Sequence, residues 1–235
     1  MAKIAIDIDS TLYDFETPAR EAFTKLANER NDRTLFQGAY SPWTEWRSPA
    51  DVCGLEAWLD AIELCHSEEI ILAQRPFNGA VETCKALANE GHDLLFISNR
   101  AIESAQATHD WLQEWEFPLD GGILEGEEYH GGHALKVLST DKKPLIKDCQ
   151  YLIDDRPKTV VDFIYDLDWQ NRFGPMHDDA INPDLKRRAC VIAYAYNQAL
   201  TDIPHLYLAP TWAGINQYLV SKGVLLAPAY HPLGI

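Results

Sequence analysis

The sequence predicts an α/β protein with a mostly parallel sheet that is covered by helices on both faces. Apolar runs of strand length alternate with amphipathic segments of helix length, which is the order that parallel strands with helical crossovers require. Residues 15–76 depart from this order, because helix-like segments follow one another there without a strand between them. The chain has 235 residues, of which 46% are hydrophobic and 24% are charged. This composition is typical of a globular protein that can bury a sizeable core.

Four apolar runs are the predicted strands. They cover residues 3–8 (KIAIDI), 92–98 (HDLLFIS), 151–155 (YLIDD) and 188–197 (RACVIAYAYN). The fourth run is rich in β-branched and aromatic residues, which favour a strand over a helix. A further short strand is expected at residues 121–126 (GGILEG).

Amphipathic periodicity predicts helices between these strands. AVETCKALANEG ends at Gly91 and TWAGINQYLVSKG ends at Gly223, and glycine is the usual residue just past a helix end. ESAQATHDWLQEWEF, KPLIKDCQ and TVVDFIYDL are further helical segments. After the first strand, EAFTKLANER and GLEAWLDAIELCHSEEIILA are predicted helical, with LFQGAYSPWTEWRSP as an irregular connection between them.

The charge and the apolar pattern limit the kinds of partner and location. Because 36 acidic residues outnumber 20 basic ones, the net charge is −16, and stable binding to the phosphates of a nucleic acid is not expected. No run approaches the roughly 18 apolar residues of a membrane span, and the N-terminus lacks a signal-peptide pattern. We therefore expect a cytoplasmic protein with a small-molecule substrate. The oligomeric state stays open, and a homodimer is compatible with the sequence. Five scattered cysteines predict reduced, buried thiols.

Carboxylates stand at the ends of two predicted strands. Asp7 and Asp9 end the first strand, and Asp154 and Asp155 end the third. Residues i and i+2 of a strand lie on the same side, so Asp7 and Asp9 repel each other unless a cation lies between them. A polar turn closed by side-chain hydrogen bonds is the alternative. Ligands of parallel sheets bind beyond the carboxyl ends of the strands, where such carboxylates could hold Mg²⁺.

Donors for a phosphate group are expected at the same edge of the sheet. Ser98 ends the second strand and precedes a helix, so it can donate to a phosphate oxygen together with backbone N–H groups. Lys142 and Lys143 shortly precede the third strand and can supply fixed positive charge. Carboxylates, cations and phosphate donors together are the set that phosphoryl transfer needs.

The segments DIDST, SNR, DKK and LIDDRP, in this order, resemble the four motifs of the haloacid dehalogenase-like phosphohydrolase superfamily. Within it the chain is most similar to the 5′(3′)-deoxyribonucleotidases, through the lysines before LIDDR, the helical insertion after the first motif and the modest length. The resemblance covers residues 7–155, about two-thirds of the chain. It implies a three-layer α/β/α, Rossmann-like core made of residues 1–14 and 77–235, and a small helical cap domain of residues 15–76.

The resemblance also implies catalytic and metal-binding roles. Asp7 would be the nucleophile that forms an aspartyl-phosphate, and Asp9 would act first as general acid and then as general base. Mg²⁺ would be held by Asp7, the backbone carbonyl of Asp9 and Asp154, with Asp155 in support.

Phosphate and substrate binding follow from the same resemblance. Ser98, Asn99 and a lysine would hold the phosphoryl group. Lys143 fits the family spacing and Lys142 fits the family's DK dipeptide, so both are candidates, with Lys143 preferred.

Further residues are candidates for contact with the rest of the substrate. Thr11 would shape the loop after the first strand, and Arg156 would either reach the site or cap its own loop. Trp43 and Trp46 are expected to stack on a nucleobase, which typically contributes about 1–3 kcal/mol per base, or else to form the small core of the cap.

The predicted activity is the Mg²⁺-dependent hydrolysis of (deoxy)ribonucleoside monophosphates to nucleoside and phosphate, as in a 5′-nucleotidase. One alternative is a phosphatase for another small metabolite, such as a sugar phosphate. A phosphatase for nucleic-acid 3′ ends is a second alternative, which the net charge opposes. The third is a binding module that keeps the fold without the chemistry, and the presence of all the motif residues opposes it.

Overall fold

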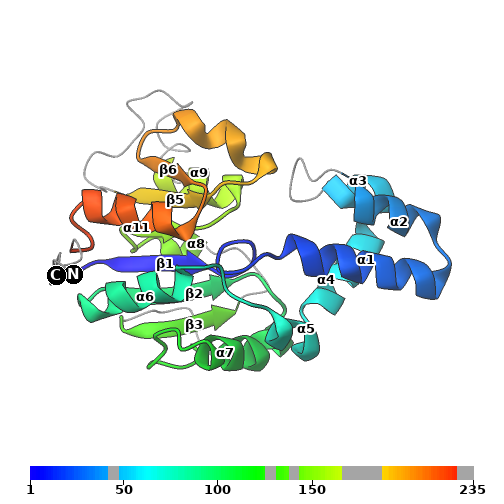
Figure 1. Ribbon diagram of the computed structural model, residues 1–235, viewed down its shortest axis with the longest axis horizontal. Helices are drawn as coiled ribbons and strands as arrows, with labels where there is room; N and C mark the ends of the chain where they lie inside the picture. The colour runs from blue at the N-terminus through cyan, green and yellow to red at the C-terminus, as the bar shows by residue number, and fades with distance from the viewer. Residues whose placement is uncertain (42–47, 125–130, 138–142, 166–186, 227–235) are drawn as a thin grey trace, which may run out of the picture.

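The computed structural model describes residues 1–41, 48–124, 131–137, 143–165 and 187–226. Six strands form one sheet in the order β3-β2-β1-β4-β5-β6, and every neighbouring pair is parallel (Figure 1). The strands are β1 (Lys3–Asp7), β2 (Asp93–Ser98), β3 (His133–Val137), β4 (Tyr151–Ile153), β5 (Arg188–Ile192) and β6 (Leu206–Ala209). The predicted α/β fold with a parallel sheet is therefore confirmed.

Helices cover both faces of the sheet and make the predicted three layers. One face packs against α6 (Ala80–Asn89), α7 (Ala105–Glu114) and α11 (Trp212–Ser221), and the other against α8 (Lys143–Ile146) and α9 (Pro157–Tyr165). Successive residues of β1 alternate between the two layers, with Ile4 and Ile6 in the first apolar cluster and Ala5 in the second. Burial on both sides explains why the strand sequences are continuously apolar.

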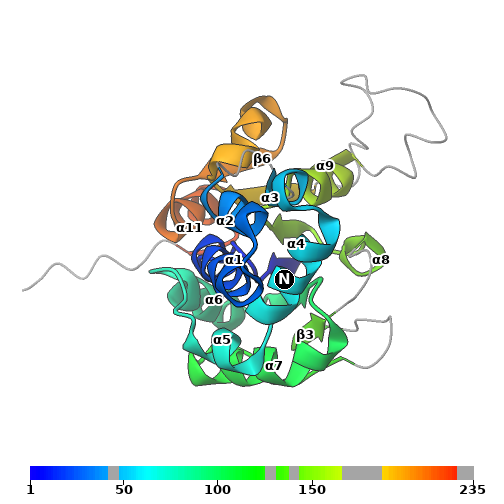
Figure 2. The ribbon, with the colours of Figure 1, turned by 90° about the vertical axis from the view of Figure 1, so that its right-hand side faces the viewer.

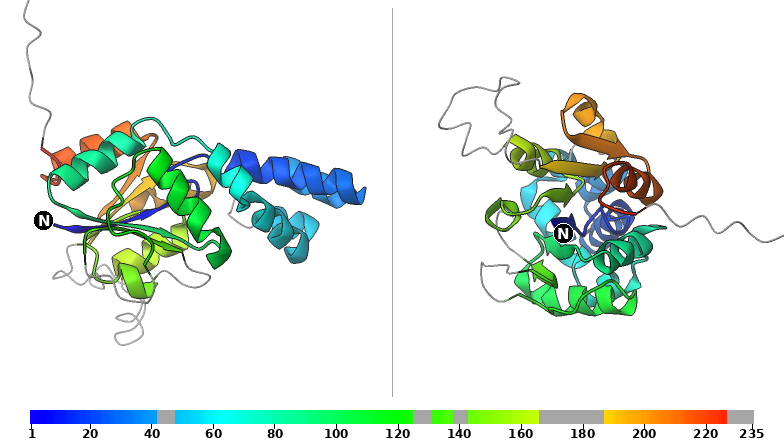
Figure 3. Two further views of the ribbon diagram at one scale, coloured as in Figure 1. Left: turned by 90° about the horizontal axis from the view of Figure 1, so that it is seen from below. Right: turned by 90° about the vertical axis from the view of Figure 1, so that its left-hand side faces the viewer.

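A helical insertion follows the first strand, as predicted. It consists of α1 (Glu16–Arg30), α2 (Arg33–Tyr40), α3 (Ser48–Cys53), α4 (Leu55–Cys65) and α5 (Glu68–Ala73). These helices project beyond the end of the sheet toward which the strand arrows point (Figures 1 and 3). The chain returns to the core at Phe77, whose backbone N–H donates to the carbonyl of Leu12 at 2.7 Å. The insertion thus lies over the carboxyl ends of the strands.

Two strand predictions need correction. GGILEG does not form a strand within the described residues, because Ile123 makes only an isolated bridge to Leu135. The strand beside β2 is instead β3, with the sequence HALKV. It was not predicted because Lys136 interrupts the apolar pattern. The stem of Lys136 is buried, and its Nζ donates to the carbonyl of Leu124 at 3.0 Å. The run at 188–197 ends as a strand at Ile192, and a 3₁₀ helix follows. The short strand β6 was not predicted.

The cap also contains a helix where an irregular connection was predicted. α2 includes residues 35–40 because Asp32 caps its N-terminus, accepting from the N–H of Thr34 at 2.8 Å. Leu35 and Ala39 are buried on its inner face. The helix α2 is therefore stabilised by burial of its inner face and by Asp32, which precedes the segment that was predicted to be irregular.

Two further expectations concern the thiols and the helices. All five cysteines are free thiols, four of them buried, as predicted. None of the helices in the described part of the chain has the length and apolar character that crossing a membrane requires.

Candidate active site

Three carboxylates converge at the carboxyl edge of the sheet. Asp7 is the last residue of β1, and Asp154 and Asp155 directly follow β4, which pairs with β1. One carboxylate oxygen from each lies within 4.8 Å of the other two, and all three side chains are buried. The sequence placed these acids at two strand ends, and the pairing of β1 with β4 brings them together.

This cluster fits a divalent metal ion. Three buried negative charges at this separation repel one another and lack bulk water, so a cation among them would offset a large electrostatic cost. The donors are all carboxylate oxygens, which suits a hard cation such as Mg²⁺ better than a thiophilic metal. Among the acidic, histidine and cysteine side chains of the described residues, this cluster has ligand atoms close enough together to bind one metal ion.

Neighbouring residues orient the carboxylates. The backbone N–H of Arg156 donates to Asp154 Oδ1 at 2.8 Å, and the hydroxyl of Tyr196 donates to Asp155 Oδ2. Asn197 donates to the backbone carbonyl of Asp155 at 3.1 Å. Such outer contacts usually fix how a carboxylate presents its remaining lone pairs to a metal.

The loop after β1 turns tightly around the first carboxylate. Ser10 has a φ of 59°, and the N–H groups of Thr11 and Leu12 both donate to the carbonyl of Ile8. Thr11 Oγ1 lies 3.4 Å from Asp7 Oδ2, and the indole N–H of Trp212 holds the carbonyl of Thr11 at 2.7 Å. Thr11 is thus held between β1 and α11 by these two contacts, and its proposed role in shaping the loop stays a prediction.

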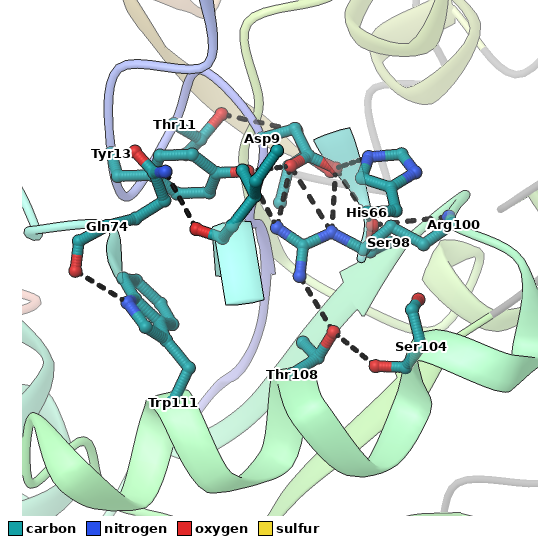
Figure 4. A network of polar contacts seen from close by, with 12 residues as sticks. Asp9, Thr11, Tyr13, His66, Gln74, Ser98, Arg100, Ser104, Thr108 and Trp111 are labelled. Carbon is teal, nitrogen blue, oxygen red and sulfur yellow. Dashed lines mark hydrogen bonds and ion pairs between the residues drawn. The ribbon is translucent and has the colours of Figure 1, made fainter. Parts of the chain in front are cut away.

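Asp9 is not one of the three clustered carboxylates, and its side chain takes part in a polar network that Figure 4 shows. Arg100 donates two hydrogen bonds to the carboxylate of Asp9, from Nη2 to Oδ1 at 2.7 Å and from Nε to Oδ2 at 3.1 Å. Tyr13 donates to Oδ1 at 2.5 Å and Ser98 Oγ to Oδ2 at 3.2 Å. His66, at the end of α4 in the cap, places Nε2 at 3.5 Å from Oδ2.

Arg100 is fully buried and is the centre of this network. Its Nη1 donates to Thr108 of α7 at 2.7 Å, and Nη2 also reaches the hydroxyl of Tyr13 at 2.8 Å. Burial by itself would raise the pKa of Asp9, but the charges of Arg100 and His66 outweigh it and hold that pKa well below the usual range for a carboxyl group. Asp9 is thus held as a carboxylate.

Several of these residues escaped the sequence analysis. Arg100 is the last residue of the SNR segment, which was the available signal, but its partners on α7 and in the first loop could not be identified from spacing. His66 and Tyr196 had no comparable signal, because each approaches the site from a distant segment of the chain.

The remaining predicted site residues are placed as follows. Ser98 is the last residue of β2 and contacts Asp9, while Asn99 is exposed and lines a cavity. Arg156 touches the site through its backbone. Lys143 begins α8, but its side chain lies outside the described part of the structure. Lys142, Trp43 and Trp46 also lie outside the described residues.

A cavity of about 650 Å³ adjoins the network of Asp9. It lies between the cap helices α4 and α5 and the segment from the end of β2 to α7. Figure 2 views the molecule from the cap end, with α5 beside α7, and those two helices are in contact. The indole N–H of Trp111 on α7 donates to the carbonyl of Gln74, just after α5, at 2.9 Å.

The chain is similar in sequence to two bacterial proteins that carry the name "putative nucleotidase". The protein of Oceanobacillus iheyensis is 29% identical over 166 residues, which are 69% of this chain and 80% of the relative. The protein of Bacillus cereus is 25% identical over 164 residues, which are 67% of this chain and 78% of the relative. No protein-family model matches the chain.

Among solved structures, the chain is similar to a haloacid dehalogenase-like family hydrolase from Streptococcus pneumoniae. The two share 12% sequence identity, with a TM-score of 0.54 over 93% of this chain and 98% of the other. At this identity the similarity establishes a common fold, and the residues of the site must carry any inference about chemistry.

Proposed function

We propose, taking the haloacid dehalogenase-like fold of this chain as the premise, that it is a metal-dependent phosphomonoesterase acting on nucleoside monophosphates, with deoxyribonucleotides as the favoured class. The observation that carries the proposal is the buried cluster of Asp7, Asp154 and Asp155 at the carboxyl edge of the sheet. The names of the two bacterial relatives support the choice of nucleotides as substrates.

In the first proposed step, a carboxylate oxygen of Asp7 attacks the phosphorus atom of the substrate. The bond from phosphorus to the leaving oxygen breaks, and that oxygen takes a proton from Asp9. The product is an aspartyl-phosphate on Asp7 together with the free nucleoside. In the second step, water gives a proton to Asp9 and attacks phosphorus, which releases inorganic phosphate and restores Asp7.

The contacts of Asp9 bear on both steps. Arg100 favours the carboxylate form, which is the form that accepts a proton from water. Arrival of a phosphate dianion beside Asp9 would raise its pKa, since a second negative charge favours the neutral carboxyl group. The proposed first step requires Asp9 to carry a proton when substrate is bound, and this shift is in the direction that the step needs.

The remaining roles follow from position. Asp7, Asp154 and Asp155 would hold Mg²⁺, with the backbone carbonyl of Asp9 as a further ligand. When bound, the ion would neutralise the carboxylates and the phosphate oxygens. Ser98, Asn99 and Lys143, or Lys142 in its place, would hold the phosphoryl group.

Replacement of Asp7 tests the proposed chemistry. Asp7→Asn should abolish phosphate release from nucleoside monophosphates in the presence of Mg²⁺, because an amide oxygen is a far weaker nucleophile than a carboxylate. Asp14→Asn, in an exposed acid of the same loop, should keep wild-type turnover. Circular dichroism should show both variants folded, and retained turnover in Asp7→Asn would refute the covalent scheme.

A substrate panel tests the specificity. The wild type should release phosphate faster from common ribo- and deoxyribonucleoside monophosphates than from sugar phosphates. Equal rates across the panel would favour a phosphatase for another small metabolite. Release from the 3′ end of an oligonucleotide would favour the nucleic-acid alternative.

A further inference from the structure

The cavity next to Asp9 lies where the leaving group of the proposed reaction must be. Asp7 attacks phosphorus from one side, and the leaving oxygen exchanges a proton with Asp9, so the leaving group lies on the Asp9 side of the phosphorus atom. His66, whose Nε2 is 3.5 Å from Asp9 Oδ2, also lines the cavity. So does Asn99, the residue after Ser98.

The size of the cavity suits a nucleoside. Its volume of about 650 Å³ falls inside the range of roughly 300–1,000 Å³ that is usual for small-molecule sites. Part of its wall is apolar, with Leu59 and Ile62 on the cap side and Ala101 and Ala107 on the core side. The face of an aromatic base could therefore pack against this part of the wall.

Apart from His66, the ionisable side chains of the wall are all acidic. Among the described residues that line the cavity, four are acidic and none is lysine or arginine; the acids are Glu63, Glu68, Glu103 and Asp110. They come from both sides, two from the cap and two from the core. A cleft with charge of one sign concentrates ligands of the opposite or no charge and disfavours ligands of the same charge.

We infer that this cavity receives the leaving group and that its acidic wall restricts the substrate to phosphomonoesters whose leaving group is uncharged or cationic. A nucleoside 5′-monophosphate, whose leaving group is a neutral nucleoside, belongs to this class. A nucleoside 3′,5′-bisphosphate does not, because its second phosphate would enter the cavity among four carboxylates. The inference rests on the proposed function, which it narrows to a substrate class.

The test compares two substrates that differ in a single group. For wild-type protein with Mg²⁺, kcat/KM for a deoxyribonucleoside 5′-monophosphate should exceed that for the matching 3′,5′-bisphosphate by at least about tenfold, given several like-charge interactions across the cavity. In the triple variant Glu63→Gln, Glu68→Gln, Asp110→Asn this ratio should fall by about tenfold, since most of the repulsion is removed.

A matched variant separates the cavity from the general charge of the protein. Glu56→Gln, Glu69→Gln, Glu114→Gln removes the same number of charges from the same three helices at positions outside the cavity wall, and should leave the ratio at its wild-type value. An equal change in both triple variants would overturn the inference, as would a wild type that accepts both substrates equally.

The outcomes also separate this inference from the proposed function. A wild type that hydrolyses monophosphates but shows no discrimination keeps the phosphatase assignment and refutes the substrate class. A wild type that releases phosphate from neither substrate refutes the proposed nucleotide phosphatase, and the inference with it.

Discussion

At the scale of single residues, the ion pair of Asp9 and Arg100 is the contact most sensitive to substitution. The Arg100 side chain has no exposed surface, and that of Asp9 is 13% exposed. Two donors of the guanidinium meet the carboxylate, and the third nitrogen of the fork is engaged by Thr108. A forked arginine contact of this kind fixes the direction of a carboxylate as well as its charge.

Removing both partners of this pair should cost less than the sum of the two separate removals. Arg100→Met leaves a carboxylate largely buried and without its main counter-charge, so the free energy of unfolding should fall by about 3–5 kcal/mol. Asp9→Asn leaves the cation buried and should also destabilise the chain. In the double variant the carboxylate charge is gone, so the loss should be smaller than the sum of the two single losses.

Urea unfolding of the four proteins measures this double-mutant cycle. The coupling free energy should be about 1 kcal/mol or more in favour of the pair. Thr24→Val, which removes a hydroxyl that donates to the carbonyl of Arg20 within α1, provides a control whose effect should add to that of Arg100→Met without coupling. Simple additivity of Asp9→Asn and Arg100→Met would show that the pair contributes no specific stability.

At the scale of elements, the cap is organised by local signals and by its own packing. Asp32 begins α2 by accepting from both the N–H and the hydroxyl of Thr34, at 2.8 and 2.7 Å. Trp58 of α4 stacks on Phe23 of α1, with ring centroids 5.7 Å apart, and is 3% exposed. One residue thus fixes where a helix begins, and the other joins two helices.

Asp32, which caps the N-terminus of α2, should make the stability of the protein depend on pH. The hydroxyl and N–H of Thr34 hold the pKa of Asp32 below its usual value. The stabilisation is therefore fully present above the unfolded-state pKa of about 3.9 and is lost as pH falls through the lower pKa of the folded state. Asp32→Ala should lower the urea midpoint at neutral pH, and the difference from wild type should shrink below about pH 4.

Asp32→Asn is the matched variant for this prediction. Asparagine caps helices about as well as aspartate but does not titrate, so its advantage over Asp32→Ala should stay constant with pH. The expectation fails if the wild type and Asp32→Asn respond identically to acid once each is referred to Asp32→Ala.

Truncation of Trp58 should loosen the cap. Trp58→Ala leaves a large cavity between α1 and α4 and should lower the free energy of unfolding by about 3–5 kcal/mol. Trp58→Phe keeps a ring against Phe23 and should cost less. Urea unfolding measures both, and a loss below about 1 kcal/mol for Trp58→Ala would mean that the cap is not stabilised by this contact.

At the scale of the whole molecule, the fold concentrates negative charge at one sheet edge. Asp7, Asp154 and Asp155 are buried there beneath a cap, in a chain whose net charge is −16. A cation that binds the folded chain and not the unfolded one stabilises it, by about 2.7 kcal/mol when its concentration is about 100 times Kd. The stability of this chain should therefore depend on divalent metal.

Asp154→Asn should change stability in opposite directions with and without metal. In EDTA the variant loses one of three mutually repelling charges, so its Tm should equal or exceed that of the wild type. With Mg²⁺ in large excess over Kd the wild-type Tm should rise by several degrees and that of the variant should not. Calorimetry measures the Tm of both proteins in EDTA and in Mg²⁺. Equal responses to Mg²⁺ in the two proteins would exclude a metal at this cluster.

The sequence by itself determined the parts of this protein that depend on local pattern. The central strands are apolar on both faces, so they are visible as runs, and the acids that end them must meet at one edge of a parallel sheet. Of the inserted helices, α1, α4 and α5 follow from periodicity, whereas α2 lies where an irregular connection was predicted. These features depend on residues within one turn or a few positions of each other, which is the range over which sequence patterns carry information.

Only the tertiary structure decided which side chains meet. Arg100 reaches Asp9 across 91 positions, and Tyr196 reaches Asp155 across 41. Strand β3 was hidden because its lysine breaks the apolar run, and it is held by pairing with β2 rather than by its own pattern. The acidic cavity exists only where α4 and α5 face α7. Such contacts are selected by the packing of the whole chain, because side chains far apart in sequence interact only once the sheet and the cap have formed.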